Sequence, residues 1–75
     1  MVTLSERLFT LRKEQKLTQE YTAKELGISL KSYCRYETGE REPAASVLIR
    51  MADFYGVAID YLVGRTEERS WPWPR

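Results

Sequence analysis

The sequence contains no histidine, one cysteine among its 75 residues and no long apolar run. A single cysteine cannot form an internal disulfide, and a chain without histidine lacks a Cys/His zinc site, so we expect neither a metal nor a cofactor. The sequence also lacks a glycine-rich phosphate loop and the volume for a large pocket, so we do not expect an enzyme. Because there is neither a signal peptide nor a long apolar run, we expect a cytoplasmic protein.

The chain also has little net charge. Its 12 Lys and Arg residues against 11 Asp and Glu residues leave a net charge of +1, which argues against a protein that coats nucleic acid without sequence preference. The charge is uneven, however, because residues 1–41 carry eight basic and six acidic side chains, whereas residues 42–75 carry four and five. Any basic binding surface should therefore be local and belong to the first half of the chain.

Apolar residues recur at helical spacing in five segments, and no segment alternates between apolar and polar for long enough to form a strand. In the first segment, Leu4, Leu8 and Leu11 would share one helix face. These patterns predict a compact all-α domain over residues 1–65. Its five helices are expected at about residues 3–15, 18–26, 29–37, 44–55 and 58–63.

The stretch from Thr18 to Gly39 predicts two short helices joined by a tight turn. Thr18 and Ser29 can each cap a helix N-terminus, and Gly27 tolerates the positive φ that ends the first helix. The apolar side chains of the second helix turn inward, which leaves a polar and cationic face outside. A face of this kind suits the major groove of DNA.

The residues of this stretch resemble the helix-turn-helix of Cro and phage-repressor-type regulators, the xenobiotic-response-element-like group. The resemblance rests on Gln19, Ala23, Gly27, Ile28, Ser29, Tyr36, Glu37 and Gly39. The flanking stretches LRKEQKLTQE and PAASVLIRMADFYGVAIDYLVGR resemble the first, fourth and fifth helices of the same family, so that the likeness covers about residues 3–65. It implies a sequence-specific DNA-binding transcriptional regulator, in the simplest case a repressor that binds a pseudo-palindromic operator as a homodimer.

The resemblance assigns base reading to the first two turns of the second helix of the motif. The candidates there are Leu30, Lys31 and Arg35, with Ser32 and Cys34 beside them. Arg35 is the strongest of these because a guanidinium group can donate two parallel hydrogen bonds to O6 and N7 of guanine.

The family also implies contacts to the DNA backbone. Gln19 begins the first helix of the motif, where relatives use its amide to contact a phosphate, and the N-terminus of a helix favours an anionic oxygen. Further candidates for phosphate contacts are Ser29, Lys16 and Arg41. Arg12 and Glu37 resemble the ion pair that ties the first helix to the end of the reading helix. Ala44 and Ala58 stand where relatives usually carry a capping serine, so each should forgo about 1 kcal/mol of stability.

Residues 66–75 are expected to form a C-terminal tail, in which two Trp-Pro steps cannot continue a helix. Either this tail is a disordered end, or Trp71 and Trp73 pack on the domain or on a second subunit. A homodimer would then use the fifth helix and the tail, through Tyr61, Val63 and the two tryptophans. Two alternatives to the repressor remain open on the same scaffold: an antitoxin-type regulator, and a protein-interaction module that does not bind DNA.

Overall fold

The computed structural model describes residues 2–70, and within them the chain forms five helices and no strand. The helices are α1 (Leu4–Glu14), α2 (Gln19–Leu26), α3 (Leu30–Thr38), α4 (Ala45–Tyr55) and α5 (Ile59–Leu62). The prediction of an all-α fold is confirmed, and each helix end lies within one residue of its expected place. No helix among the described residues is long and apolar enough to cross a membrane.

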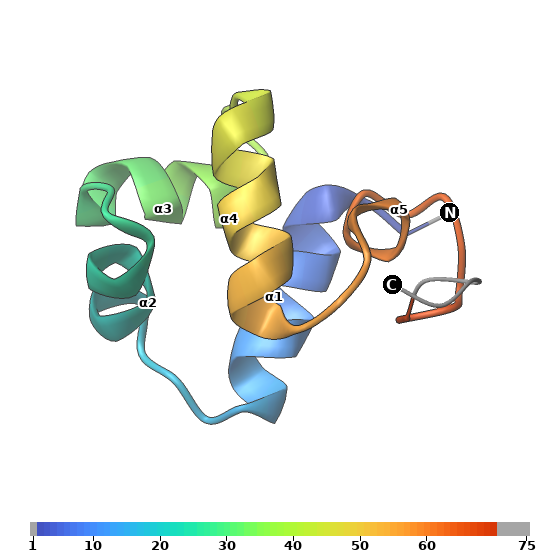
Figure 1. Ribbon diagram of the computed structural model, residues 1–75. Helices are drawn as coiled ribbons and strands as arrows, with labels where there is room; N and C mark the ends of the chain where they lie inside the picture. Colours follow the sequence, from blue (N-terminus) through green and yellow to red (C-terminus); the bar gives the residue numbers. More distant parts are fainter. Residues whose placement is uncertain (1, 71–75) are drawn as a thin grey trace.

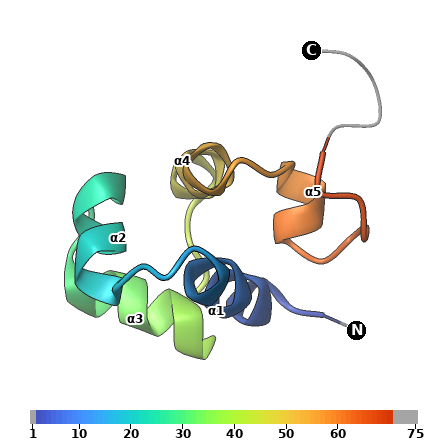
Figure 2. The same ribbon diagram turned by 90° about the horizontal axis from the view of Figure 1, so that it is seen from below.

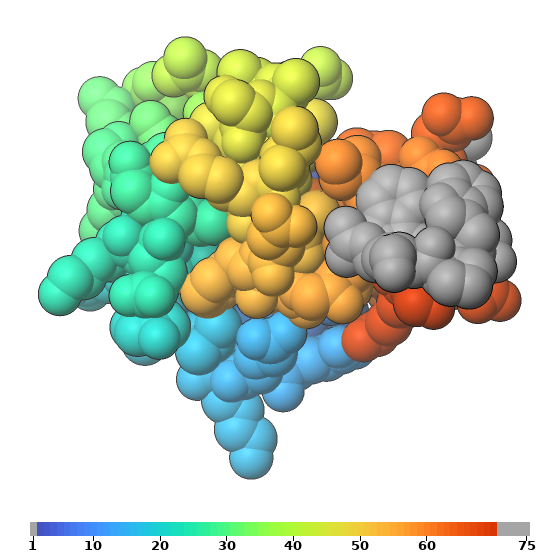
Figure 3. Space-filling model, viewed as in Figure 1, coloured from blue at the N-terminus to red at the C-terminus, as the bar shows by residue number. Residues whose placement is uncertain are grey.

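α1 and α4 form the centre of the domain, with α2 and α3 on one side and α5 on the other (Figures 1 and 2). α1 contacts α3 and α5, whereas α4 contacts α2 and α5. On the face shown in Figure 3, α4 runs between the α2–α3 side and the α5 side. The buried core therefore draws on every helix, through Leu8, Leu11, Ala23, Leu26, Tyr33, Tyr36, Met51, Ala52, Tyr55, Val57, Tyr61 and Leu62.

Side-chain caps define where the first three helices begin. Thr3 forms a capping box with Glu6 at the start of α1. The hydroxyl of Thr18 accepts a hydrogen bond from the Tyr21 amide at 3.0 Å, and that of Ser29 accepts one from the Ser32 amide at 3.1 Å. The N-cap residues of α4 and α5 are Ala44 and Ala58, which provide no side-chain cap, as the sequence predicted.

The turn between α2 and α3 depends on Gly27, which has φ of 72° and lies just after the last residue of α2. A side chain here would be strained at this φ, and its Cβ would meet the guanidinium of Arg50 at 3.3 Å. Arg50 itself donates a hydrogen bond of 2.8 Å to the carbonyl of Leu26. α4 therefore caps the C-terminus of α2 and helps to hold the helix-turn-helix against the core.

A polar cluster lies inside this core. The hydroxyl groups of Tyr33 and Tyr55 are 2.6 Å apart and join α3 to α4, and burial raises the pKa of Tyr33. Thr22, which is fully buried, donates to the Thr18 carbonyl at 2.9 Å. Among the described residues, no buried side-chain nitrogen or oxygen lacks a hydrogen-bond partner, so these polar groups are accommodated without an unpaired donor or acceptor.

Residues 65–70, which follow α5, fold back over α1 and α5. The carbonyl of Arg69 accepts a hydrogen bond of 2.7 Å from the Ala58 amide, and its guanidinium pairs with Glu14 of α1. Glu67 pairs with Arg7 at 2.6 Å. Residues 67 and 69 thus tie this segment to α1 and to the start of α5. Trp71 and Trp73, for which the sequence left both a disordered end and packing on the domain or on a second subunit open, lie outside the described residues.

This arrangement corrects the expectation that Tyr61 contributes to a surface between subunits. The Tyr61 ring is buried, because the guanidinium of Arg7 stacks 3.7 Å from its centroid and that of Arg69 lies 5.3 Å away. The aromatic side chain of α5 is therefore already covered within the subunit. Val63, the other residue of that predicted surface, is only partly buried.

Candidate nucleic-acid interface

α3 divides into a buried face and an exposed face. Tyr33 and Tyr36 point into the core, whereas Lys31 and Arg35 are exposed on the other side of the helix. Within residues 2–70, neither of these two cations forms an ion pair or a side-chain hydrogen bond. Leu30, at the start of α3, is an exposed large apolar residue. The strongest predicted base-reading side chains are therefore available to an external partner.

The two weaker base-reading candidates are placed differently. Ser32 and Cys34 are half-buried, and Ser32 shares a hydrogen bond of 3.0 Å with the hydroxyl of Ser29. Cys34, which we expected on the outer face, lies at the contact between α3 and α2, where its Sγ donates to the side chain of Gln19. The side chains of Ser32 and Cys34 therefore already form hydrogen bonds within the protein.

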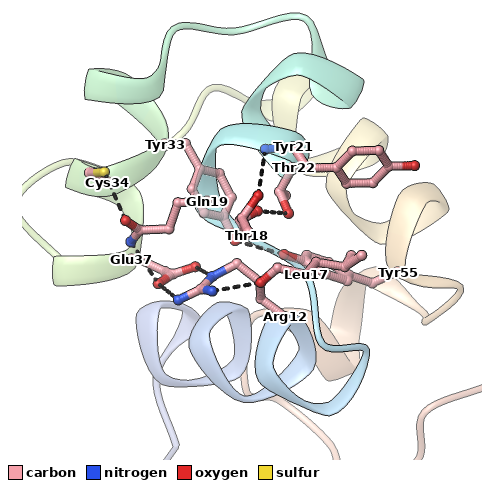
Figure 4. Close-up of polar contacts among 10 residues, drawn as sticks. All are labelled: Arg12, Leu17, Thr18, Gln19, Tyr21, Thr22, Tyr33, Cys34, Glu37 and Tyr55. Carbon is pink, nitrogen blue, oxygen red and sulfur yellow. Dashed lines mark hydrogen bonds and ion pairs between the residues drawn. The ribbon is translucent and has the colours of Figure 1, made fainter.

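Gln19 lies at the centre of a hydrogen-bond network that joins three helices (Figure 4). Its Nε2 donates to Oε1 of Glu37 at 3.1 Å, and its Oε1 accepts from the Cys34 Sγ at 3.4 Å. Glu37 also accepts from Nε of Arg12 at 2.6 Å and from a terminal nitrogen of the same guanidinium at 3.1 Å. The sequence predicted the pair of Arg12 and Glu37, but the contact of Cys34 depends on how α2 and α3 cross.

The ion pair of Arg12 and Glu37 is almost completely buried, with 10% of the first side chain and 4% of the second exposed. Burial alone would raise the pKa of Glu37, but hydrogen bonds, led by that from Arg12, outweigh it and hold the pKa below its usual value. Arg12 also donates a hydrogen bond of 2.8 Å to the carbonyl of Leu17, directly before the Thr18 cap. A single guanidinium thus fixes α3 and the start of α2 relative to α1.

The remaining phosphate candidates lie at the edges of the motif. Lys16 is exposed in the turn between α1 and α2, and its φ of 58° is a strained value for a residue with a side chain. Arg41 is exposed in the loop between α3 and α4, and Figure 1 shows this loop at the opposite end of the molecule from the turn between α1 and α2. Ser29 uses its hydroxyl to cap α3. Gln19 and Ser29 are therefore each bonded to residues of α3, whereas Lys16 and Arg41 belong to separate connecting segments.

Comparison with known proteins agrees with this geometry. The model of a helix-turn-helix family matches residues 8–62. The chain belongs to this family. The resemblance to Cro and phage repressors, first seen in the residues of α2 and α3, is thereby confirmed.

Several relatives share this helix-turn-helix domain. It is 40% identical over 63 residues to the HTH-type transcriptional regulator YobD of Bacillus subtilis, a match that covers 84% of this chain and 56% of the relative. It is 45% identical over 62 residues to the cryptic phage CTXphi transcriptional repressor RstR of Vibrio cholerae, which covers 83% of this chain and 55% of that protein. The chain therefore spans a little over half the length of these curated relatives.

Solved structures of helix-turn-helix proteins show the same fold. A transcriptional regulator from Listeria innocua superimposes with a TM-score of 0.80 at 32% identity, over 95% of this chain and 65% of that one. The P22 c2 repressor, crystallised in complex with a synthetic operator, gives a TM-score of 0.82 at 26% identity, over 88% of this chain and all of that one. The five-helix architecture is thus that of repressor DNA-binding domains.

Proposed function

We propose that this protein is a sequence-specific DNA-binding transcriptional regulator, which acts in the cytoplasm as a repressor and without enzymatic activity. The observation that carries the proposal is the exposed face of α3, where Lys31 and Arg35 have no partner within residues 2–70 while the opposite face is fully packed. Relatives named as transcriptional regulators and repressors, and the operator complex of the P22 c2 repressor, support it.

In this proposal, α3 enters the major groove and Arg35 donates to O6 and N7 of a guanine, with Lys31 and Leu30 beside it. The amide of Gln19 contacts a phosphate at the N-terminus of α2. Because one reading helix covers few base pairs, we propose a homodimer on two half-sites about 34 Å apart. With Tyr61 buried, the candidate dimer surface is the groove of about 370 Å³ between the start of α1 and α4, which is lined in part by Leu4, Leu48 and Val63.

Titrations of Arg35→Ala and Gln19→Ala test the proposal, after selection of a preferred duplex from a random library. Arg35→Ala should lose about 1 to 3 kcal/mol on the preferred duplex and bind scrambled DNA nearly as before. Gln19→Ala should weaken both duplexes by a similar factor. Because a neutral amide displaces few counterions, it should also leave the salt dependence almost unchanged.

Two outcomes would contradict this assignment. Equal losses of Arg35→Ala on both duplexes would show that Arg35 does not read a base. If the parent protein shows no preference within the library, the proposal of a sequence-specific DNA-binding regulator is wrong. A protein-interaction module then becomes the better proposal, and the exposed Glu40 and Glu42 are the feature that supports it. Sedimentation of the free protein and of the complex tests the homodimer separately.

A further inference from the structure

The amide of Gln19 is held at both of its ends. Its nitrogen faces Glu37 and its oxygen faces Cys34, and both partners are residues of α3 (Figure 4). A primary amide has two N–H donors, of which the bond to Glu37 uses one. The second hydrogen of Nε2 has no acceptor among residues 2–70. Gln19 therefore retains one donor for a partner outside the protein.

The orientation of this amide follows from the chemistry of its neighbours. An ionised carboxylate can only accept hydrogen bonds, and Arg12 keeps Glu37 ionised, as the lowered pKa of Glu37 indicates. A reversed amide would place its oxygen against that carboxylate and its N–H₂ group against the S–H of Cys34. The contact with Glu37 would then join two acceptors, and that with Cys34 would keep only a weak N–H···S bond, so the observed orientation is the stable one.

We infer that Glu37 and Cys34 are positioning residues for the backbone contact of Gln19: they fix its amide so that the remaining N–H is presented to a phosphate oxygen. The inference rests on the proposed function, and it gives Cys34 a role other than base reading. It also means that the phosphate contact is set by α3 itself, since both holding residues belong to the helix that carries Arg35. A shift of the reading helix would therefore also move the amide that anchors the domain on the DNA backbone.

A double-mutant cycle tests this inference on the preferred duplex and on a scrambled duplex. Cys34→Ala should weaken both duplexes by a similar factor, roughly threefold, because it removes one neutral hydrogen bond. In the Gln19→Ala background the same substitution should have no further effect. Cys34→Ser, which keeps a donor, should bind closer to the parent than Cys34→Ala does. Thr38→Ala is the matched control, because it removes a side-chain hydrogen bond near the end of α3 without touching Gln19.

The cycle has clear contrary results. If Cys34→Ala changes the preference between duplexes, or if its effect adds to that of Gln19→Ala, Cys34 acts on the DNA directly and the inference is overturned. A failure of the parent to bind any duplex is a different result, because it overturns the proposed function and with it the phosphate contact.

Nuclear magnetic resonance of the free protein tests the held amide without DNA. The sequence has two glutamines and no asparagine, so the side-chain amide signals come from Gln15 and Gln19 alone. The Gln19 signals should exchange with water more slowly than those of Gln15, whose side-chain amide makes, within residues 2–70, a single long hydrogen bond of 3.5 Å to the Tyr55 carbonyl. Cys34→Ala should shift the Gln19 signals, and so should Glu37→Gln, in which the added glutamine contributes a third pair of amide signals. Thr38→Ala should not shift them. Gln19 signals that match those of an exposed amide in the parent would overturn the inference.

Discussion

Two arginines of α1, five residues apart, tie the helix to opposite sides of the molecule. Arg12 pairs with Glu37 on the helix-turn-helix side and Arg7 pairs with Glu67 on the C-terminal side, and in both pairs the closest nitrogen and oxygen are 2.6 Å apart. The surroundings differ, because the side chain of Glu37 is 4% exposed whereas that of Glu67 is 82% exposed. The two pairs therefore differ in energy although their distances are equal. Solvent weakens the attraction in an exposed ion pair, whereas the loss of one partner from a buried pair leaves the other charge buried and unpaired.

Arg7 stabilises the C-terminal side through the stacking of its planar guanidinium on Tyr61 more than through its ion pair with Glu67. Its guanidinium is buried against the ring of Tyr61, and it donates to the Tyr61 carbonyl at 3.3 Å. Stacking of this kind and a hydrogen bond to a carbonyl do not require a charged partner. The C-terminal side thus depends on packing of a cation on an aromatic ring, and the helix-turn-helix side on a buried pair of charges.

The largest effect is expected for Arg12→Ala. Removal of this cation leaves Glu37 buried without its partner, so we expect a loss of about 3 to 5 kcal/mol in the free energy of unfolding. Urea denaturation followed by circular dichroism would measure it. As a control, the double variant Arg12→Met, Glu37→Leu should lose less than either single variant, because it buries no unpaired charge. A loss below about 1 kcal/mol for Arg12→Ala would mean that the pair of Arg12 and Glu37 contributes no more than an exposed ion pair. The two sides of the molecule would then not differ in the way proposed.

Arg7→Ala should have the next largest effect, about 1 to 3 kcal/mol, because it removes the stacking on Tyr61 and a hydrogen bond from a charged donor. Glu67→Ala is the matched comparison, and it should cost much less since the carboxylate is mostly in water. Thermal unfolding of both variants would measure the difference. Similar losses for the two would mean that the ion pair, and not the stacked ring, holds the C-terminal side.

The stability of the protein at low pH should also depend on the buried pair of the helix-turn-helix side. The pKa of Glu37 is lower in the folded state than its usual value near 4.5, so below that value the unfolded chain binds more protons and stability falls. The contribution of Glu37 is complete above about pH 4.5 and disappears as the pH falls through its folded pKa. Unfolding measured from pH 7 to pH 3 should therefore show a weaker pH dependence in Glu37→Gln than in the parent. Identical slopes would show that Glu37 has the same pKa in the folded and unfolded chains.

The smallest effect is expected for Arg69→Ala. Arg69 and Glu14 are 50% and 43% exposed, and surface ion pairs contribute little to stability. The carbonyl of Arg69, which accepts from the Ala58 amide, is kept in the variant. The melting temperature should be close to that of the parent at both low and high salt. A drop as large as that of Arg7→Ala would indicate that residues 65–70 depend on this side chain to fold back over α5.

The sequence predicted the local structure closely because its signals are local. Thr18, Ser29 and Gly27 act on backbone groups within a few residues of themselves, and the structure confirms each of them. Two placements went differently. Cys34 turned toward α2, and Tyr61 became covered by Arg7, because each outcome depends on a residue at least 15 positions away in the chain.

What the sequence determined by itself is the set of five helices, their caps and the motif that identifies the family, since helical periodicity and capping need only neighbouring residues. The tertiary structure alone decided which of the polar side chains on α2 and α3 remain available to a partner. Arg35 and Cys34 are adjacent in the sequence, yet one is exposed and the other is bonded to Gln19. The physical reason is that successive residues of a helix point about 100° apart, so the crossing of α2 over α3 covers one of them and leaves its neighbour in solvent.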